Sequence, residues 1–257
     1  NRSSPVSVSG ISAATKVVTG NDFSCTLLDN KTVQCWGRGN RYQLGNGSNA
    51  DSSTPVSINN LTSIEDIDAG YSRACALHDN GSVACWGRHL TLEHNAWSVN
   101  VTNYTAPTWI QGISNAKSVG VGSSNGHSCV LHDNDTVSCW GRNANYGQLG
   151  IGSNALWTTS SSPQNVTGLT GAVSLTVSNN TSCAVLTGGT VKCWGKDYGN
   201  SPVTVSDITN ATQISSGSYH RCARLSNSTI KCWGSGWSGQ LGNGSTAGSG
   251  GTPVLVS

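Results

Sequence analysis

Charged side chains are scarce in this chain of 257 residues. Asp, Glu, Lys and Arg together make up 10% of it, and Glu occurs only as Glu65 and Glu93. The formal net charge is +2 and is spread evenly, which is too little to build a surface that tracks nucleic-acid phosphates. Low charge combined with nine Trp and ten Cys also argues against a disordered chain. No apolar run approaches the roughly 18 residues of a membrane span. We therefore expect neither a nucleic-acid partner nor a membrane span.

Motifs for catalysis are equally sparse. Residues 122–126 match G-x-S-x-G, but a nucleophile elbow needs a strand-to-helix turn and no helix is predicted there. Glu65, Asp66 and Asp68 cluster without a facing carboxylate partner, and residues 133–135 lack the rest of a calcium-binding loop. The sequence therefore predicts no catalytic residue, no cofactor site and no metal site, and hence no enzyme.

The ten cysteines form five pairs, and each pair is separated by nine residues. None is a C-x-x-C, so a zinc knuckle or a thioredoxin-like site finds no support. An even number of regularly spaced cysteines favours disulfides and an oxidising compartment. The first residue is Asn1 rather than Met, as expected of a mature product whose targeting peptide has been removed. We expect a secreted protein, located outside the cell at a cell surface.

Sequons for N-glycosylation are more frequent than the composition alone would produce. The alternative is that turns favour Asn and Ser/Thr for their own hydrogen bonding. The candidate glycosylation sites are Asn30, Asn46, Asn60, Asn80, Asn100, Asn103, Asn134, Asn165, Asn179, Asn180, Asn210, Asn227 and Asn243.

A repeat organises the whole chain. Cys-Trp-Gly occurs five times, and the first cysteines of successive pairs are 50, 54, 54 and 39 residues apart. Each unit reads as a Pro-initiated strand, a second strand that ends at Gly or Ser, a tight hairpin with the cysteine pair, and a loop rich in Gly and Asn. The predicted units cover residues 5–54, 55–106, 107–162, 163–201 and 202–252, followed by a terminal strand at 253–257.

The hairpin predicts the disulfide pairing. Between Cys75 and Cys85 the sequence Asp79-Asn80-Gly81 is a strong turn signal flanked by β-prone arms. The cysteines lie symmetrically about the turn, so they should face each other on neighbouring strands, at a distance that a disulfide spans. Each bond should stabilise the fold by about 2–3 kcal/mol. The predicted disulfides are Cys25–Cys35, Cys75–Cys85, Cys129–Cys139, Cys183–Cys193 and Cys222–Cys232.

Units of this length with four short strands and one aromatic signature are typical of propeller blades. One blade cannot bury both faces of its sheet, so the repeats must stack around an axis. The predicted fold is all-β, a single five-bladed β-propeller with one hairpin disulfide in each blade. The tryptophans that follow the second cysteines should fill the spaces between blades: Trp36, Trp86, Trp140, Trp194 and Trp233.

Residues 139–152 (Cys-Trp-Gly-Arg-Asn followed by Tyr-Gly-Gln-Leu-Gly-Ile-Gly) and 239–244 resemble the regulator of chromosome condensation repeat. The resemblance implies a β-propeller. The founding member of that family is a seven-bladed nuclear exchange factor for a small GTPase, whereas this chain has five repeats and paired cysteines. Similar propellers serve as a secreted bacterial β-lactamase inhibitor, as ubiquitin-ligase modules and as a plant light sensor. The resemblance therefore implies a binding platform, whose function has to be argued from its site.

Departures from the repeat indicate where a partner could bind. Units 1, 3 and 5 carry Gln-Leu-Gly in the last loop, unit 2 replaces it with residues 88–97, and unit 4 deletes it. Aromatics outside the shared pattern anchor interfaces and sugar rings, although they could equally cover blade edges. The candidate partner-binding residues of this group are Arg88, His89, Glu93, His94, Trp97, Tyr104, Trp109 and Trp157.

A second candidate set stands two positions before each first cysteine. If the preceding strand is innermost, these side chains would crowd the mouth of the central channel, although such residues more often cap a turn or a carbonyl. They are Phe23, Arg73, His127 and His220, with Thr181 at the fourth position.

The six prolines outnumber the five Cys-Trp-Gly cores, so one terminal strand is surplus. It either lies on the surface or pairs with an exposed edge of the next molecule, which would generate a filament. The candidate assembly residues are Pro5, Val6 and Val8 at one end and Pro253, Val254 and Val256 at the other.

Together these features predict a non-catalytic extracellular interaction or structural protein at a cell surface, self-assembling into a fibre or coat as one alternative. Its partner would be a protein, either a second copy of itself or another surface protein, or a glycan. The other alternative is a soluble secreted binder, a lectin or an enzyme inhibitor, that uses the unit 2 loop and exposed aromatics.

Overall fold

The structure is a computed structural model that describes the chain except residues 1–3, 93–98, 124–125, 144–145 and 154–158. The described residues form five antiparallel sheets of four strands each, and the strands of every sheet follow one another in chain order. The prediction of an all-β propeller with five blades is confirmed. In the part of the chain that the structure covers, no helix is long and apolar enough to span a bilayer.

The four strands of each blade are named here from the centre outward. The inner strands are β1 (Ala14–Thr19), β5 (Ile64–Ala69), β9 (Ala116–Val121), β13 (Ala172–Val177) and β17 (Ala211–Ser216). The second strands are β2 (Phe23–Leu28), β6 (Arg73–His78), β10 (His127–His132), β14 (Thr181–Leu186) and β18 (His220–Leu225). The third strands are β3 (Val33–Gly37), β7 (Val83–Leu92), β11 (Val137–Arg142), β15 (Val191–Gly195) and β19 (Ile230–Gly234). The outer strands are β4 (Ser52–Ser57), β8 (Val99–Trp109), β12 (Thr159–Asn165), β16 (Gly199–Thr204) and β20 (Gly250–Leu255).

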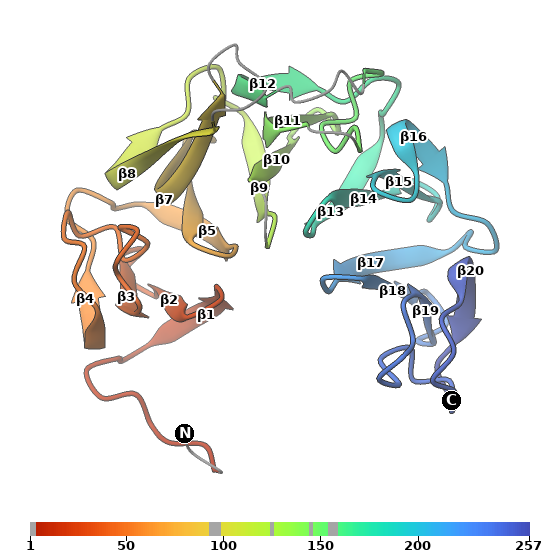
Figure 1. Ribbon diagram of the computed structural model, residues 1–257, viewed down its shortest axis with the longest axis horizontal. Coiled ribbons are helices and arrows are strands. Elements are labelled where there is room, and N and C mark those ends of the chain that lie inside the picture. Colours follow the sequence, from red (N-terminus) through yellow and green to blue (C-terminus); the bar gives the residue numbers. More distant parts are fainter. Residues whose placement is uncertain (1–3, 93–98, 124–125, 144–145, 154–158) are drawn as a thin grey trace.

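The blades succeed one another around a common centre, with blade 1 and blade 5 at the two ends of the series (Figure 1). From β1 to β17, each inner strand packs against the inner strand of the blade that follows it in the chain. All five inner strands contribute to the lining of one central cavity of about 490 Å³. The strand before the cysteine hairpin is therefore the innermost strand of each blade.

The hairpin between the second and third strands turns as the sequence predicts. The third turn residue has a positive φ in every blade, between 62° and 85°, at Lys31, Gly81, Asp135, Gly189 and Ser228. In four blades the residue before it is Asn, whose Oδ1 accepts hydrogen bonds from the backbone N–H and the hydroxyl two positions further on. Local hydrogen bonding therefore accounts for an Asn-x-Ser/Thr pattern at these tips without reference to a glycan.

All five disulfides form as predicted, one in each blade, and no free cysteine remains. In each hairpin the two cysteines are direct partners across the strand pair, with Cα atoms 4.0–4.1 Å apart. Their side chains are buried in the blade. Each bond therefore joins the two middle strands of a sheet.

The other two residues of Cys-Trp-Gly have distinct structural tasks. Four of the five tryptophans are fully buried between blades, and Trp36 of blade 1 is half-buried. The glycine that follows adopts a φ between 89° and 108° and begins a bulge against the outer strand. A Cβ there would come within 1.9–2.5 Å of the carbonyl oxygen that precedes the second strand, so only glycine fits.

Pro55, Pro107, Pro163, Pro202 and Pro253 lie within outer strands, where a missing N–H leaves no sheet hydrogen bond unmade. These prolines do not open the strands as the sequence suggested, because each strand begins at least two residues earlier. The blades observed therefore differ by one strand from the repeat units predicted from the sequence. Each proline-containing strand is the outer strand of the preceding blade and does not start a new sheet.

This offset identifies the surplus segment. Pro253 and Val254 belong to β20, which completes blade 5 by pairing with β19. Residues 5–8 form no strand, and the side chains of Val6 and Val8 are 57% and 42% exposed. The unpaired apolar segment therefore lies near the N-terminus.

Candidate functional site: the loop face of the propeller

The antiparallel topology gives the propeller two different faces. The hairpins that carry the disulfides lie at one end of every sheet, which we call the hairpin face. The connections from inner to second strand and from third to outer strand lie at the opposite end, which we call the loop face. Blades differ from each other on the loop face, because the third connection varies in length from blade to blade.

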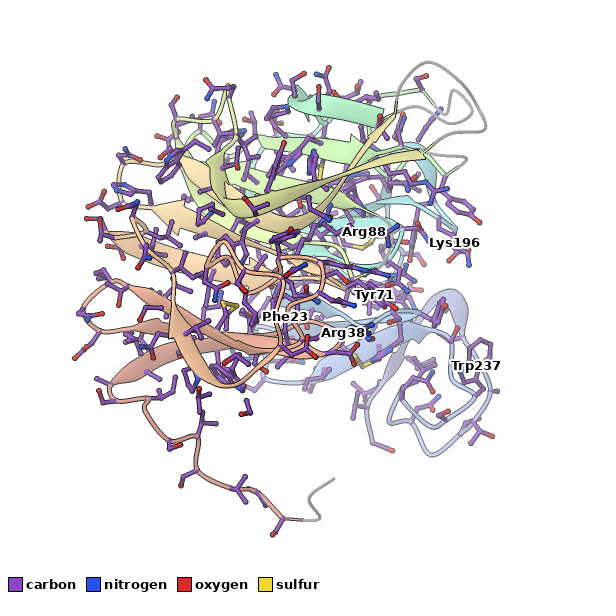
Figure 2. The ribbon with its side chains drawn as sticks, turned by 60° about the vertical axis from the view of Figure 1, so that its left-hand side comes forward. Phe23, Arg38, Tyr71, Arg88, Lys196 and Trp237 are labelled. Carbon is purple, nitrogen blue, oxygen red and sulfur yellow. A yellow bond between two sulfur atoms is a disulfide. The ribbon has the colours of Figure 1, made fainter. Side chains whose placement is uncertain are left out.

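A cation recurs on the loop face directly after Cys-Trp-Gly. It is present in four blades, as Arg38, Arg88, Arg142 and Lys196, and blade 5 has Ser235 there. The backbone N–H of each of these residues donates to the carbonyl oxygen of the residue just before the second strand, which fixes its position. Figure 2 shows Arg88, Lys196 and the exposed Trp237 on the right-hand side of the molecule.

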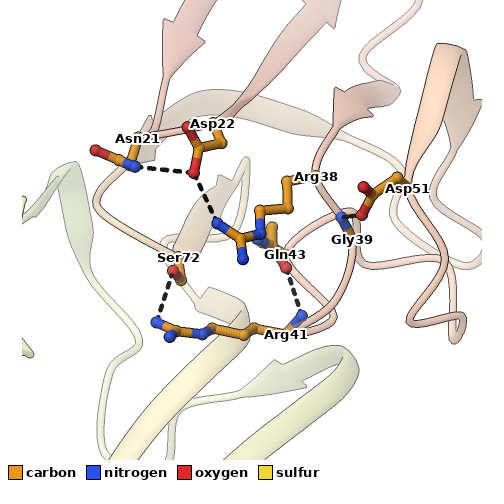
Figure 3. A network of polar contacts seen from close by, with 8 residues as sticks. All are labelled: Asn21, Asp22, Arg38, Gly39, Arg41, Gln43, Asp51 and Ser72. Atoms are coloured by element: carbon orange, nitrogen blue, oxygen red, sulfur yellow. Dashed lines mark hydrogen bonds and ion pairs between the residues drawn. The ribbon is translucent and has the colours of Figure 1, made fainter.

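Blade 1 holds its cations with a polar network (Figure 3). The Arg38 guanidinium pairs with the Asp22 carboxylate at 3.1 Å, and Asn21 donates to the same carboxylate at 2.9 Å. These two hydrogen bonds, that of Arg38 first, lower the pKa of Asp22. Arg41 is positioned by its backbone N–H, which donates to Gln43 Oε1 at 2.7 Å, and its guanidinium donates to Ser72 Oγ at 3.4 Å.

Arg41 and Arg88 form a pair of like charges between blades 1 and 2. Partial burial and then the neighbouring Arg41 lower the pKa of Arg88. The Arg41 guanidinium lies 5.9 Å from the centre of the Tyr71 ring, a cation–π distance. Within the described part of the chain, neither arginine has a carboxylate at ion-pair distance. This cluster of Arg41, Arg88 and Tyr71 therefore carries net positive charge on the loop face.

A cleft of about 650 Å³ opens on the loop face between blades 4 and 5. Blade 4 supplies Lys196, Asp197 and Tyr198, and blade 5 supplies Tyr219, Arg221, Trp237 and a glycine-rich rim. The Tyr219 and Trp237 rings meet edge to face, with centroids 6.2 Å apart. We call this hollow the blade 4/5 cleft.

The insertion in unit 2 begins at Arg88, and from there to Leu92 it is an extension of a strand and not a loop. Strands β7 and β8 continue past the blade edge and pair from Arg88 with Asn103 to Leu92 with Val99. Their β-branched residues favour this extended pairing. His89 is buried and stacks on the half-buried Tyr104 at 4.6 Å. Burial, and next Arg73, lower the pKa of His89 to about 4, and burial raises that of Tyr104.

Trp109, another candidate of this group, does not join Arg88. Trp109 is exposed, pairs with Ala84 near the start of β7 and contacts His78 edge to face, so it lies toward the hairpin face. Glu93, His94, Trp97 and Trp157 lie outside the described residues.

In the second candidate set, Arg73 and His127 lie in interfaces between blades. Phe23, Arg73 and His127 are buried, and His220 is half-buried. The rings of Phe23 and His220 cover the glycine that follows their own inner strand: a Cβ on Gly20 or Gly217 would come within 1.9 Å or 2.4 Å of them. The lining of the central cavity comes from inner-strand residues instead.

Arg73 and His127 link three blades. The Arg73 guanidinium donates to the His127 carbonyl oxygen in blade 3, and His127 Nε2 lies 2.8 Å from Ser182 Oγ in blade 4. Burial, and next Arg73, lower the pKa of His127 to about 3, and burial lowers that of Arg73 to about 10. These contacts give both residues a role in holding neighbouring blades together.

Sequence reasoning missed the residues that gather in the blade 4/5 cleft and around Arg41. The signal was present in part: the recurring cation after Cys-Trp-Gly and the deletion in unit 4 are both visible in the sequence. The side chains that meet there are separated by up to 41 residues, however, as Lys196 and Trp237 are. Among the described residues, no three His, Cys, Asp or Glu side chains cluster as a metal site would require.

Fold and repeats together define a repeat β-propeller. Family models described as regulator of chromosome condensation (RCC1) repeat match residues 32–77, and 14–43 with 118–148. These segments of the chain are therefore similar to the RCC1 repeat. No curated protein is similar enough in sequence to count as a relative.

Solved structures show the same fold. Human WBSCR16 is 17% identical, with a TM-score of 0.79 over 95% of this chain and 67% of that one. Yeast RCC1 (Prp20), solved bound to Kap60, is 16% identical, with a TM-score of 0.56 over 94% of this chain and 74% of that one. The ectodomain of the Physcomitrella patens receptor kinase CR4 is 21% identical, with a TM-score of 0.52 over 87% of this chain and 51% of that one. At these identities the likeness concerns the fold alone.

Proposed function

We propose that this chain is a non-catalytic extracellular interaction protein of a cell surface, and that its loop face binds an acidic surface of a partner protein. The observation that carries the proposal is the cation at the same position in four consecutive blades. Because equivalent positions lie at the same end of each sheet, Arg38, Arg88, Arg142 and Lys196 contribute charge to one face. A face on which positive charges outnumber negative ones steers and orients a partner of the opposite sign.

We place the main contact with the partner at the Arg41–Arg88 cluster. Two guanidinium groups held close together by the fold repel each other, and a carboxylate from a partner would relieve that repulsion. Tyr71 adds a 41% exposed aromatic ring beside them. Tyr and Arg are the residue types in which binding energy concentrates at protein interfaces.

The extracellular setting is supported by the cysteines. All ten are consumed in disulfides, one per blade, and such frameworks persist in oxidising compartments. The exposed turns leave the sequon at Asn30, and those at the equivalent tips, available on the hairpin face, opposite the proposed binding face. Glycans at these tips would lie away from the loop face, whereas the candidate sequons at Asn46, Asn179, Asn180 and Asn243 lie in loop-face connections.

The test is binding to a panel of purified secreted ectodomains that spans acidic to basic isoelectric points. The chain is compared with Arg41→Gln/Arg88→Gln and with the control Lys31→Gln/Lys231→Gln, which removes the same charge from the hairpin face. We expect acidic ectodomains to bind, the first variant to lose at least tenfold in affinity, and the control to bind as the parent does. Binding that is indifferent to the first variant, or equally reduced by the control, would overturn the proposal.

Self-assembly is a second candidate function, and the unpaired segment at residues 5–8 favours it. Its apolar side chains are exposed while β20 already occupies the outer position of blade 5. An extended segment of this kind can add to an exposed strand edge of a second copy. Light scattering on the chain and on a variant that lacks residues 1–8 tests this: polymers that vanish with the deletion support it, and a monomer or unchanged polymers contradict it.

A further inference from the structure

The blade 4/5 cleft exists because unit 4 lacks the loop that closes the equivalent space elsewhere. In blades 1 and 3 the Gln-Leu-Gly loop buries its leucine, Leu44 or Leu149, and packs its glycine against the tryptophan of the next blade. Blade 4 passes from β15 to β16 through only Lys196, Asp197 and Tyr198. The space that a loop fills between other blades is therefore left as a hollow of about 650 Å³.

The walls of the cleft are aromatic and exposed. Trp237 is 69% exposed and Tyr219 is 49% exposed, so two large rings meet water rather than a neighbouring blade. They stand at 63° to each other, which presents two apolar faces to one ligand. The rim on the blade 5 side is built of Gly236, Gly248, Gly250 and Gly251, where no side chain shields the backbone polar groups.

A buried cation lies in the cleft without a matching anion. Arg221 is only 4% exposed, and its Nε has no hydrogen-bond partner. Its guanidinium lies 5.6 Å from the centre of the Tyr198 ring, and no carboxylate of the described residues lies at ion-pair distance from it. Burial lowers the pKa of Arg221, while Tyr198 and Asp197 raise it. A buried guanidinium gains most from a carboxylate that it can bind with two parallel hydrogen bonds.

We propose that the blade 4/5 cleft binds a carboxylate-bearing sugar residue of an acidic glycan. The carboxylate would lie at Arg221 and Lys196, the ring against Trp237 and Tyr219, and the hydroxyls at the glycine-rich rim. Lys196 already lies 5.7 Å from the Tyr219 ring centre, so cation and aromatic wall are in reach of one sugar. Asp197 also lines the cleft and can accept hydrogen bonds from sugar hydroxyls.

The dimensions favour a sugar over an acidic peptide surface. A concave site of several hundred Å³ with a few polar groups is the size of a small-ligand pocket, whereas protein interfaces bury flat areas of about 800 Å² on each side. The cleft is separate from the Arg41–Arg88 cluster, from which it differs in blade and in lining residues. It can therefore bind its ligand whether or not that cluster binds a protein.

Isothermal titration calorimetry of the intact, oxidised chain tests the proposal with four probes: sialyllactose, trigalacturonic acid, neutral lactose, and an acidic peptide of glutamates. We expect at least one acidic sugar to bind and lactose to bind at least tenfold more weakly. Trp237→Ala and Arg221→Lys should each weaken binding of the acidic sugar at least tenfold.

The control is Tyr71→Ala, which removes an exposed aromatic ring from the other cluster on the same face and should leave sugar affinity unchanged. Trp237 is a surface residue, so its variant keeps the test valid if Arg221→Lys fails to fold. The proposal is overturned if neither acidic sugar binds at 5 mM, if lactose binds as well, if only the glutamate peptide binds, or if Tyr71→Ala reduces sugar binding as much as Trp237→Ala. The two proposals can fail separately. If no acidic sugar binds but Arg41→Gln/Arg88→Gln still loses affinity for acidic ectodomains, the proposed protein-binding function stands and only the sugar site is wrong.

Discussion

The indole Nε1 of Trp233 donates a 2.6 Å hydrogen bond to the phenol oxygen of Tyr198. The equivalent indoles of Trp86 and Trp194 donate instead to the backbone carbonyl oxygens of Gln43 and Gln148, at 3.0 and 3.1 Å. Blade 4 lacks the Gln-Leu-Gly loop, so a side chain replaces a backbone acceptor. The substitution keeps a buried donor satisfied while opening the cleft beside it.

Removing that acceptor should destabilise the protein. Tyr198→Phe leaves the buried Trp233 N–H unpaired, and we expect a loss of about 1–3 kcal/mol in the free energy of unfolding. Urea denaturation followed by tryptophan fluorescence measures it. The control is Tyr71→Phe, whose exposed ring makes no comparable bond, and it should match the parent. Equal stability of Tyr198→Phe and the parent would show that water replaces the phenol at no cost.

Gly45 and Gly47, in and just after the first Gln-Leu-Gly loop, allow the cost of backbone strain to be distinguished from the cost of a steric clash. Gly45 and Gly47 both have positive φ, 68° and 81°, so alanine is strained at each. A Cβ on Gly45 would come within 2.8 Å of the Trp86 ring, whereas a Cβ on Gly47 meets open space. Gly45→Ala should therefore cost about 1–3 kcal/mol more than Gly47→Ala. Thermal unfolding of the two variants compares them, and indistinguishable melting temperatures would contradict the account.

The five repeat tryptophans should differ in their contribution to stability. Trp194 is fully buried between blades 3 and 4, so Trp194→Ala should cost about 3–5 kcal/mol. Trp36 is half-buried, and Trp36→Ala should cost clearly less. Denaturant titration of both variants at pH 7 measures the difference. Similar losses would mean that Trp36 contributes through its own blade as much as Trp194 does through the interface.

Stability should depend on pH through two buried groups of opposite effect. The folded pKa of His127 is about 3, far below its ordinary value near 6.5, so its contribution is complete above pH 6.5 and is lost as pH falls toward 3. The folded pKa of Asp68 is raised to about 6, chiefly by burial, so its contribution is complete below about pH 4 and is lost as pH rises through 6.

The unfolding free energy of His127→Gln should therefore fall less than that of the parent between pH 6.5 and 4, by roughly 2 kcal/mol. Over the same range Asp68→Asn should lose stability more steeply than the parent. Parallel pH profiles for all three proteins would contradict these assignments.

Local features of the chain could be predicted because they depend on residues close together in sequence. The Asp79-Asn80-Gly81 turn sets the hairpin register, and that register places Cys75 opposite Cys85. The same reasoning holds in the other blades, and it led to the correct disulfides and to the propeller.

The candidate site was harder to predict, because strand register and burial between blades decide which side chains reach the loop face. Arg73 and His127 were expected at a channel mouth, yet they lie in the interfaces between blades, where the next blade supplies their hydrogen-bond partners. The unit 2 insertion looked like a loop, but strand pairing extends through Leu92 once Val99 and its neighbours align opposite it.

The sequence by itself determined the five disulfides and the turn chemistry, since each follows from contacts within about ten residues, and it determined the number of blades through the number of repeats. Only the tertiary structure decided which terminal segment completes blade 5, and which side chains meet on the loop face. Tyr198, Arg221 and Trp237 come together because two blades pack side by side across a deleted loop. Such a meeting depends on how neighbouring sheets stack, which is a property of the packed blades and not of any one repeat.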